Sequence, residues 1–354
     1  MTPPQSDTPT AQGDDRPSSV APPTFTPAIF AIYDLAVSPV TFDVMNFFAF
    51  ANMWTLRSGA AGYNVIFVVG PDGGFRDLTP KDKSLDPYEK VWRLRHIMAA
   101  HGHIAKRCLG VSTYHRREDF AQMLRAIHPD QMFPPGYTLT NPRTPFMLPD
   151  LFRQNLTLEE MDTFAPHPAA LRKVESWLHR HAPRGRPVSL TLRTSTIETA
   201  RNSNIPAWIE AAGRIRDRGF DPIILPDTDQ VTTGEHAGAF GDVASYPLGA
   251  IDLELRAALY SLCAINLADN GGPAFINYFM GTSSAVCFLP VEKLPEVVTM
   301  TGRGIERLAE LLGVAPYESF PGTTPARRFV WKPDTVDNIM DAFDAAAEYL
   351  AIQP

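Results

Sequence analysis

The sequence predicts an α/β protein made of two doubly wound parallel-sheet domains. Short apolar runs of strand length alternate with longer helical segments along the chain, which is typical of parallel sheets with helices on both faces. Several of these runs are apolar without alternation, as expected for strands buried on both faces. The chain has 354 residues, of which 44% are hydrophobic and 20% are charged. This length is sufficient for two domains of ordinary size.

The first domain is predicted at residues 27–150, behind a tail at residues 1–26. The tail is rich in Pro, Ser, Thr and Asp and is predicted to be disordered. Buried strands are predicted at residues 27–36, 64–69 and 108–112. Helices are predicted at residues 41–57, 88–100 and 116–127, the first of them apolar and aromatic on all sides. Prolines crowd residues 128–149 and mark the domain boundary.

The second domain is predicted at residues 184–330, after a linker and bridging helix at residues 151–183. The bridging helix is expected at residues 168–181. Strands are predicted at residues 188–193, 222–226, 264–268 and 285–289. Helices are predicted at residues 205–218 and 252–262 and from residue 273 onward. Residues 331–354 hold a final amphipathic helix, which either crosses back to the first domain or pairs with another subunit.

One predicted strand is followed by a polar, glycine-rich turn, Asp269-Asn270-Gly271-Gly272-Pro273. Proline fits a first helical position because its missing N–H costs nothing there. The turn leaves backbone N–H groups around Gly271, Gly272 and Ala274 at the carboxyl end of a buried strand, which suits a phosphate group. A tight structural turn is the alternative interpretation.

A second polar segment begins where the strand at residues 188–193 ends. It contains two arginines and several amide and hydroxyl groups, Arg193, Arg201, Asn202, Ser203 and Asn204. The planar guanidinium suits bidentate binding of phosphate oxygens, so Arg193 opposite the glycine-rich turn would clamp a pyrophosphate. The structural alternatives are a salt bridge for either arginine and a helix cap for Asn202, Ser203 and Asn204.

A third polar segment, Asp227-Thr228-Asp229, follows the strand at residues 222–226. Two such carboxylates could hold a divalent metal that bridges a nucleotide diphosphate. We instead expect no metal, with Asp227 and Asn204 lining the nucleotide end of the site. The first domain must then supply the general base, whose candidates lie near the ends of its first two strands: Asp34, Ser38 and Asp43 at the first, and residues 72–76 at the second. Asp34 and Asp43 are preferred. Either carboxylate could also be purely structural.

The composition of the chain and the absence of several motifs argue against some classes of function. A net charge of −7 argues against a broad nucleic-acid surface. The sequence contains no G-x-G-x-x-G or P-loop motif and no H-E-x-x-H. No apolar stretch is long enough to span a bilayer, and no signal peptide is evident, so a cytoplasmic location with reduced cysteines is expected. The pairs His101/His103 and His179/His181 are interpreted as surface histidines.

The three polar segments together resemble glycosyltransferases of the GT-B fold, which have two facing Rossmann-like domains and an active site in the cleft between them. Thr191-Leu192-Arg193 looks like the strand-end arginine of fucosyltransferase-like enzymes, and Asp269-Asn270-Gly271-Gly272 is similar to their Asp-Ser-Gly turn. Those enzymes carry histidine where Thr191 stands and serine where Asn270 stands. The chain also looks like a bacterial glycosyltransferase-like family.

The resemblance implies an inverting, metal-independent transfer from a nucleotide diphosphate sugar, of hexosyl or fucosyl type. No cofactor is expected beyond this co-substrate. The expected partners are the nucleotide sugar and a glycan or small-molecule acceptor, in the synthesis of a surface glycan. Three alternatives remain: a metal-dependent transferase that uses Asp227 and Asp229, a sugar-nucleotide epimerase, and a degenerate scaffold that only binds glycans.

Overall fold

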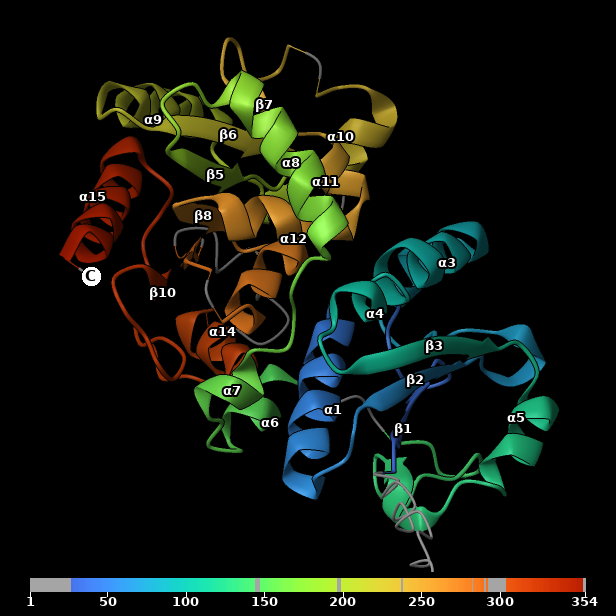
Figure 1. Cartoon of the computed structure of the whole chain (residues 1–354). Helices are drawn as coiled ribbons and strands as arrows, with labels where there is room; N and C mark the ends of the chain where they lie inside the picture. Colours follow the sequence, from blue (N-terminus) through green and yellow to red (C-terminus); the bar gives the residue numbers. More distant parts are fainter. Residues whose placement is uncertain are drawn as a thin grey trace, which may run out of the picture.

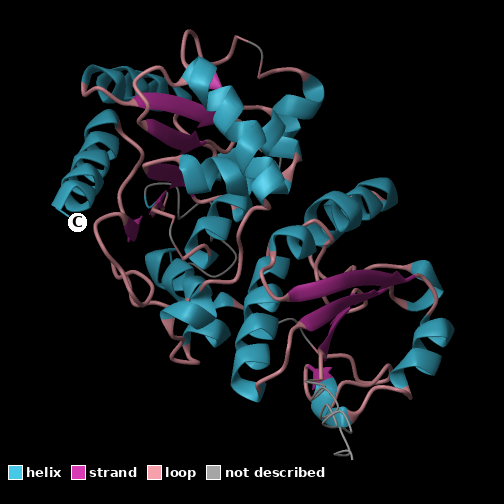
Figure 2. Cartoon of the chain, in the orientation of Figure 1, coloured by secondary structure: helices cyan, strands magenta, loops and turns pink. Residues whose placement is uncertain are grey.

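The computed structural model describes residues 27–143, 147–195, 199–236, 238–281, 283–289, 291 and 304–352. The tail that was predicted to be disordered lies outside these residues. The chain forms two parallel sheets, each flanked by helices, as predicted for an α/β protein (Figures 1 and 2). Within the described residues, no helix is both long and apolar enough to cross a membrane.

The smaller sheet has four parallel strands in the order β3-β2-β1-β4. They are β1 (Ile29–Asp34), β2 (Tyr63–Val68), β3 (Cys108–Tyr114) and β4 (Met132–Phe133). Three of the strands were predicted. β4 was not, because it is only two residues long and lies in the proline-rich segment.

The larger sheet has six parallel strands in the order β10-β9-β8-β5-β6-β7. They are β5 (Pro187–Thr191), β6 (Asp221–Leu225), β7 (Ala244–Ser245), β8 (Ile265–Asp269), β9 (Ala285–Phe288) and β10 (Arg327–Val330). The central strands were predicted because they are fully buried and apolar. The edge strands β7 and β10 were missed because one is very short and the other begins with two arginines.

The helices of the first half lie around the smaller sheet, and the last of them, α8, precedes the first strand of the larger sheet. They are α1 (Val44–Ser58), η1 (Pro71–Gly73), α2 (Pro80–Ser84), α3 (Pro87–Arg93), the π-helical η2 (Leu94–Met98), α4 (His101–Ile104), α5 (Arg117–Leu124), η3 (Pro129–Gln131), α6 (Leu148–Phe152), α7 (Leu158–Met161) and α8 (Pro168–His181). The bridging helix α8 has the predicted bounds, and it packs against α12 of the second half.

Helices of the second half cover both faces of the larger sheet (Figure 2). They are η4 (Thr199–Arg201), α9 (Ile205–Asp217), α10 (Thr228–Thr233), α11 (Leu248–Ile251), α12 (Leu253–Leu262), the 3-10 helix η5 (Gly272–Phe279), α14 (Gly304–Leu312) and α15 (Val336–Ile352). The final helix α15 does not cross back to the first half. It packs on α9, where its buried Ile339 and Phe343 join the core of the larger sheet.

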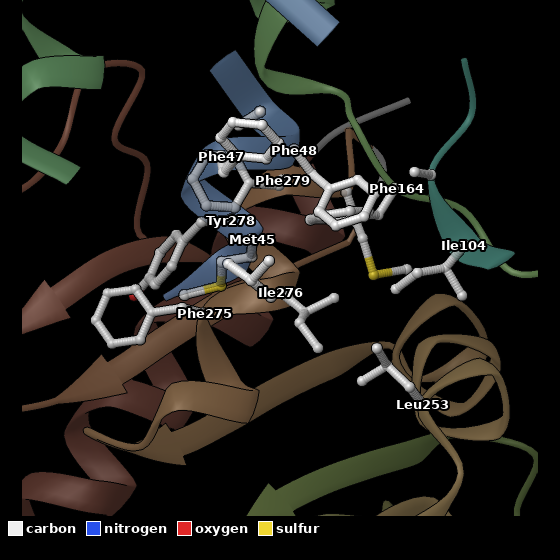
Figure 3. Close-up of a cluster of buried hydrophobic side chains, with 14 of the residues drawn as sticks. Met45, Phe47, Phe48, Ile104, Phe164, Leu253, Phe275, Ile276, Tyr278 and Phe279 are labelled. Carbon is white, nitrogen blue, oxygen red and sulfur yellow. The ribbon is translucent and has the colours of Figure 1, made fainter. Parts of the chain in front are cut away.

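One hydrophobic core joins the two sheets. Of the aromatic side chains predicted for the helix at residues 41–57, Phe47, Phe48 and Phe50 are buried, whereas Phe42 and Trp54 are partly buried against the same core. Figure 3 shows Met45, Phe47 and Phe48 beside residues of η5. Phe279 of η5 is fully buried, and its ring packs edge-on against Phe164 at 6.3 Å. Since this junction is apolar and continuous with the core of the smaller sheet, we expect the two halves to move little relative to one another.

His101 contradicts its interpretation as a surface histidine. It is fully buried among the rings of Phe42, Phe48 and Phe164, with centroids 5.7–5.9 Å away. Its Nδ1 donates to the carbonyl of Ile97 at 2.7 Å, which fixes the neutral ring with the proton on Nδ1. Burial lowers the pKa of His101 to about 4.

This burial predicts an acid-sensitive fold. Because the folded-state pKa of His101 lies below its unfolded value of 6.5, its contribution to stability is full above that value and is lost as pH falls toward 4. The difference corresponds to roughly 3 kcal/mol of unfolding free energy. Urea unfolding at a series of pH values should therefore show a flatter acid limb for His101→Gln than for the natural chain. Parallel curves for the two proteins would contradict the assignment.

Candidate active site

A cleft of about 950 Å³ lies between the two halves of the molecule. Its second-half wall is formed where β5, β6 and β8 end, the edge at which a doubly wound sheet binds ligands. Its first-half wall is formed by the start of α1, by α3 and by Met147 and Leu148. α14 closes one side with Arg307 and Leu311.

The glycine-rich turn lies in this cleft, where the sequence predicted a phosphate site. β8 ends at Asp269, and Asp269 and Asn270 are both 7% exposed. The backbone N–H groups of Gly271 and Gly272 have no hydrogen-bond partner in the part of the chain that the structure describes. The N–H of Ala274 differs from expectation, because it donates to the carbonyl of Gly271 at 3.0 Å. The helix that follows is a 3-10 helix, so the turn offers two bare N–H groups rather than three.

Close packing requires glycine at one of these positions. A Cβ on Gly272 would lie 2.7 Å from the Cβ of Phe42, which is too close for two carbon atoms. Phe42, which directly precedes Asp43, therefore packs against the glycine-rich turn. A Cβ on Gly271 would instead meet the Cδ of Arg193 at 3.9 Å, an ordinary contact. The turn is therefore bordered by α1 on one side and by Arg193 on the other.

The two arginines of the second segment both reach this region. Arg193 lines the cleft, and its Nη1 donates to Oδ1 of Asn202 at 2.5 Å. Arg201 also lines the cleft, and its Nη2 donates to the carbonyl of Asn270 at 2.8 Å. Two cations thus lie beside the glycine-rich turn, and Arg201 also holds its backbone.

The cleft is not lined by the next three predicted residues, Asn202, Ser203 and Asn204, but two of them hold Arg193. Asn202 holds the Arg193 guanidinium, and the Ser203 hydroxyl accepts the backbone N–H of Arg193 at 2.8 Å. Asn204 precedes α9 without capping it through its side chain. Its backbone N–H donates to Asp334 Oδ2 at 2.6 Å, which ties the start of α9 to the segment that precedes α15.

Asp227 and Asp229 both line the cleft. Asp227 accepts the backbone N–H of Thr194 at 3.1 Å, and Asp229 lies 3.5 Å from the hydroxyl of Ser195. Among the described residues, no group of three or more His, Cys, Asp or Glu side chains is arranged to hold a metal ion.

The structure separates the two candidate bases. Asp34 is 2% exposed, and both of its oxygens accept from Arg117, at 2.9 and 3.0 Å. The hydroxyl of Tyr137 also donates to it at 2.5 Å, and burial together with this carboxylate raises the pKa of that phenol. Asp34 is therefore a structural carboxylate, and it does not line the cleft.

Asp43 is exposed and lines the cleft. It stands at the N-terminus of α1 but does not cap the helix with its side chain. Its Oδ2 accepts the hydroxyl of Thr41 at 2.7 Å. The preceding residue, Phe42, abuts Gly272, so the backbone that carries Asp43 is anchored to the glycine-rich turn.

Arg256 lines the same cleft and was not proposed as a site residue from the sequence. A signal was present: it is the one charged residue in the apolar run from Leu255 to Leu259. Trp92 and Leu311 also line the cleft, and their roles could not be read from local patterns.

No family model matches the sequence, and no curated protein matches it. Solved structures do match. ADP-heptose LPS heptosyltransferase II of E. coli aligns with a TM-score of 0.53 at 10% identity, over 91% of this chain and 99% of that chain. A glycosyl transferase family 9 protein from Veillonella parvula DSM 2008 aligns with a TM-score of 0.46 at 9% identity, over 92% and 97%. E. coli heptosyltransferase WaaC with ADP aligns with a TM-score of 0.40 at 12% identity, over 90% and 99%.

The match to heptosyltransferase II shows that the chain has the two-sheet GT-B fold, as the sequence predicted. The narrower likeness to fucosyltransferase-like enzymes is not supported, because the structure whose match shows the fold is a heptosyltransferase.

Proposed function

We propose that the protein is a glycosyltransferase that moves a sugar from a nucleotide diphosphate sugar to an acceptor hydroxyl, with inversion and without a metal. One observation carries this proposal. An exposed carboxylate, Asp43, and a glycine-rich turn flanked by Arg193 and Arg201 line the same cleft, on walls contributed by different halves. A base and an anion site in one cleft are what a direct displacement needs.

The residues divide the chemistry between them. The Asp43 carboxylate takes the proton of the acceptor hydroxyl, whose oxygen then bonds to the anomeric carbon of the sugar. The bond from that carbon to the diphosphate breaks, and negative charge grows on the leaving diphosphate. Arg193 and the N–H groups of Gly271 and Gly272 stabilise this charge. Attack from the face opposite the leaving group inverts the anomeric centre.

The neighbouring fold guides the choice of donor to test. Heptosyltransferase II is named for ADP-heptose, so ADP and ADP-heptose belong in a ligand screen with UDP, GDP, CMP and dTDP. A ligand that binds only the folded state raises the melting temperature by an amount set by its concentration over Kd.

Thermal shift with each nucleotide, with and without manganese, tests the proposal. We expect one nucleotide to stabilise the protein without metal, and Arg193→Met to weaken that nucleotide about ten- to a hundredfold, the value of one charge-assisted contact. Arg214→Met, which removes an arginine outside the cleft, is the control and should bind normally. Stabilisation only with manganese would replace this mechanism by a metal-dependent one at Asp227 and Asp229. No stabilisation by any nucleotide would overturn it.

A further inference from the structure

Arg256 is a buried cation on the wall of the cleft. It lies in the first turn of α12 and is 2% exposed, yet it is one of the residues that line the space between the halves. Arginine is almost never fully buried without a charged partner, because removing its charge from water is costly. Its position near a helix N-terminus adds to this cost, since the helix dipole disfavours a cation there.

Among the described residues, only neutral groups contact the Arg256 guanidinium. Nε donates to the carbonyl of Gly249 at 2.7 Å, and Nη1 donates to the hydroxyl of Tyr260 at 3.1 Å. No carboxylate of the described chain lies within ion-pair distance of it, and Nη2 has no hydrogen-bond partner there. The guanidinium is thus held in place by two neutral acceptors, with one nitrogen left for a ligand.

A hydrogen-bond chain links Arg256 to the hydroxyl of Thr191, which also lines the cleft. Arginine can only donate, so the Tyr260 oxygen accepts from Arg256. The buried Tyr260 proton then has Thr191 Oγ1, 2.9 Å away, as its acceptor. The Thr191 hydroxyl keeps its own proton to donate, and Thr191 also lines the cleft. The chain of donors from Arg256 through Tyr260 to Thr191 strengthens each of its hydrogen bonds.

We propose that Arg256 Nη2 and the Thr191 hydroxyl bind an oxyanion of the ligand, as a second anion site beside the one at Arg193 and the glycine-rich turn. Thr191 and Arg193 are two residues apart, roughly 7 Å in an extended chain, so one nucleotide sugar reaches both. The oxyanion is either a phosphate of the donor or a carboxylate on the transferred sugar. The inference rests on the proposed function for the identity of this ligand, but not for the binding of an anion.

The test compares ligand binding by the natural chain and by Arg256→Met, using calorimetry. The ligands are UDP, GDP and ADP, the pairs UDP-glucose with UDP-glucuronate and GDP-mannose with GDP-mannuronate, and free pyrophosphate and glucuronate. Arg327→Met is the matched control, because Arg327 is also held by the carbonyls of Tyr278 and Met280 but does not line the cleft. Its binding should equal that of the natural chain.

If the oxyanion is a phosphate, Arg256→Met weakens the nucleoside diphosphates themselves about ten- to a hundredfold. If it is a carboxylate, the substitution leaves the diphosphates unchanged and removes a preference for the uronate over the neutral sugar of each pair. Both results support the inference, and Thr191→Val should then reproduce the loss more weakly.

The inference is overturned if folded Arg256→Met binds every one of these anions within twofold of the natural chain. If the natural chain binds no nucleotide, the proposed function fails by itself. Pyrophosphate and glucuronate then decide the question, since an Arg256-dependent affinity for either one upholds the anion site, and its absence removes it.

Discussion

Asp43→Asn is expected to lower kcat by about 10²- to 10⁴-fold, the usual contribution of a general base, with little change in nucleotide affinity. The amide has almost the same shape as the carboxylate but cannot accept the acceptor's proton. Thr41 and Gly272, which fix the position of this residue and its neighbour Phe42, are untouched. Steady-state kinetics with the donor found in the ligand screen measures the effect.

Asp34→Asn supplies the contrast, because Asp34 is the last residue of β1 and Asp43 follows the same strand. The substitution leaves Arg117 and Tyr137 without their buried anion, so we expect a loss of about 3 kcal/mol in unfolding free energy. The turnover of the remaining folded enzyme should stay near normal. A large fall in kcat for Asp34→Asn, together with an unchanged kcat for Asp43→Asn, would reverse the assignment of the base.

Phe279→Ala is expected to destabilise both halves of the molecule, by about 3–5 kcal/mol in unfolding free energy. Phe279 belongs to the second half but lies in the core shared with α1, next to Phe164 (Figure 3). Local unfolding of the smaller sheet would expose the apolar contacts between α1 and η5, so it is coupled to the second half. Amide hydrogen exchange should therefore show weaker protection in both β2 and β8.

Phe343→Ala is the matched substitution in a core that contains no residue of the smaller sheet. Phe343 is equally buried, and it packs on Phe220 within the second half. Protection should fall more in β8 than in β2 for this variant. If Phe279→Ala also left β2 fully protected, the two halves would be independent and the shared core would carry no coupling.

The order of strands and helices could be predicted because it depends on local patterns. Buried strands of a parallel sheet are apolar runs, and α8 was bounded correctly by Pro168 at its start and by the amphipathic period of its side chains. The strands missed were those without such a run, such as β10, where an edge position tolerates Arg327 and Arg328. The position of Gly271 and Gly272 directly after the end of β8 could also be predicted, because the strand, the turn and the following helix are contiguous in sequence.

The sequence by itself determined the two-sheet α/β class and the placement of Arg193 and the glycine-rich turn at strand ends. Only the tertiary structure decided which carboxylate faces the cleft. Asp34 and Asp43 look alike in sequence, and they differ because Arg117 and Tyr137, 83 and 103 residues further along the chain, pack on Asp34 alone. The burial of His101 also depends on residues distant in sequence, and so does the environment of Arg256, where no carboxylate of the described residues lies within ion-pair distance. Desolvation and charge pairing depend on neighbours in space, and local sequence does not specify those neighbours.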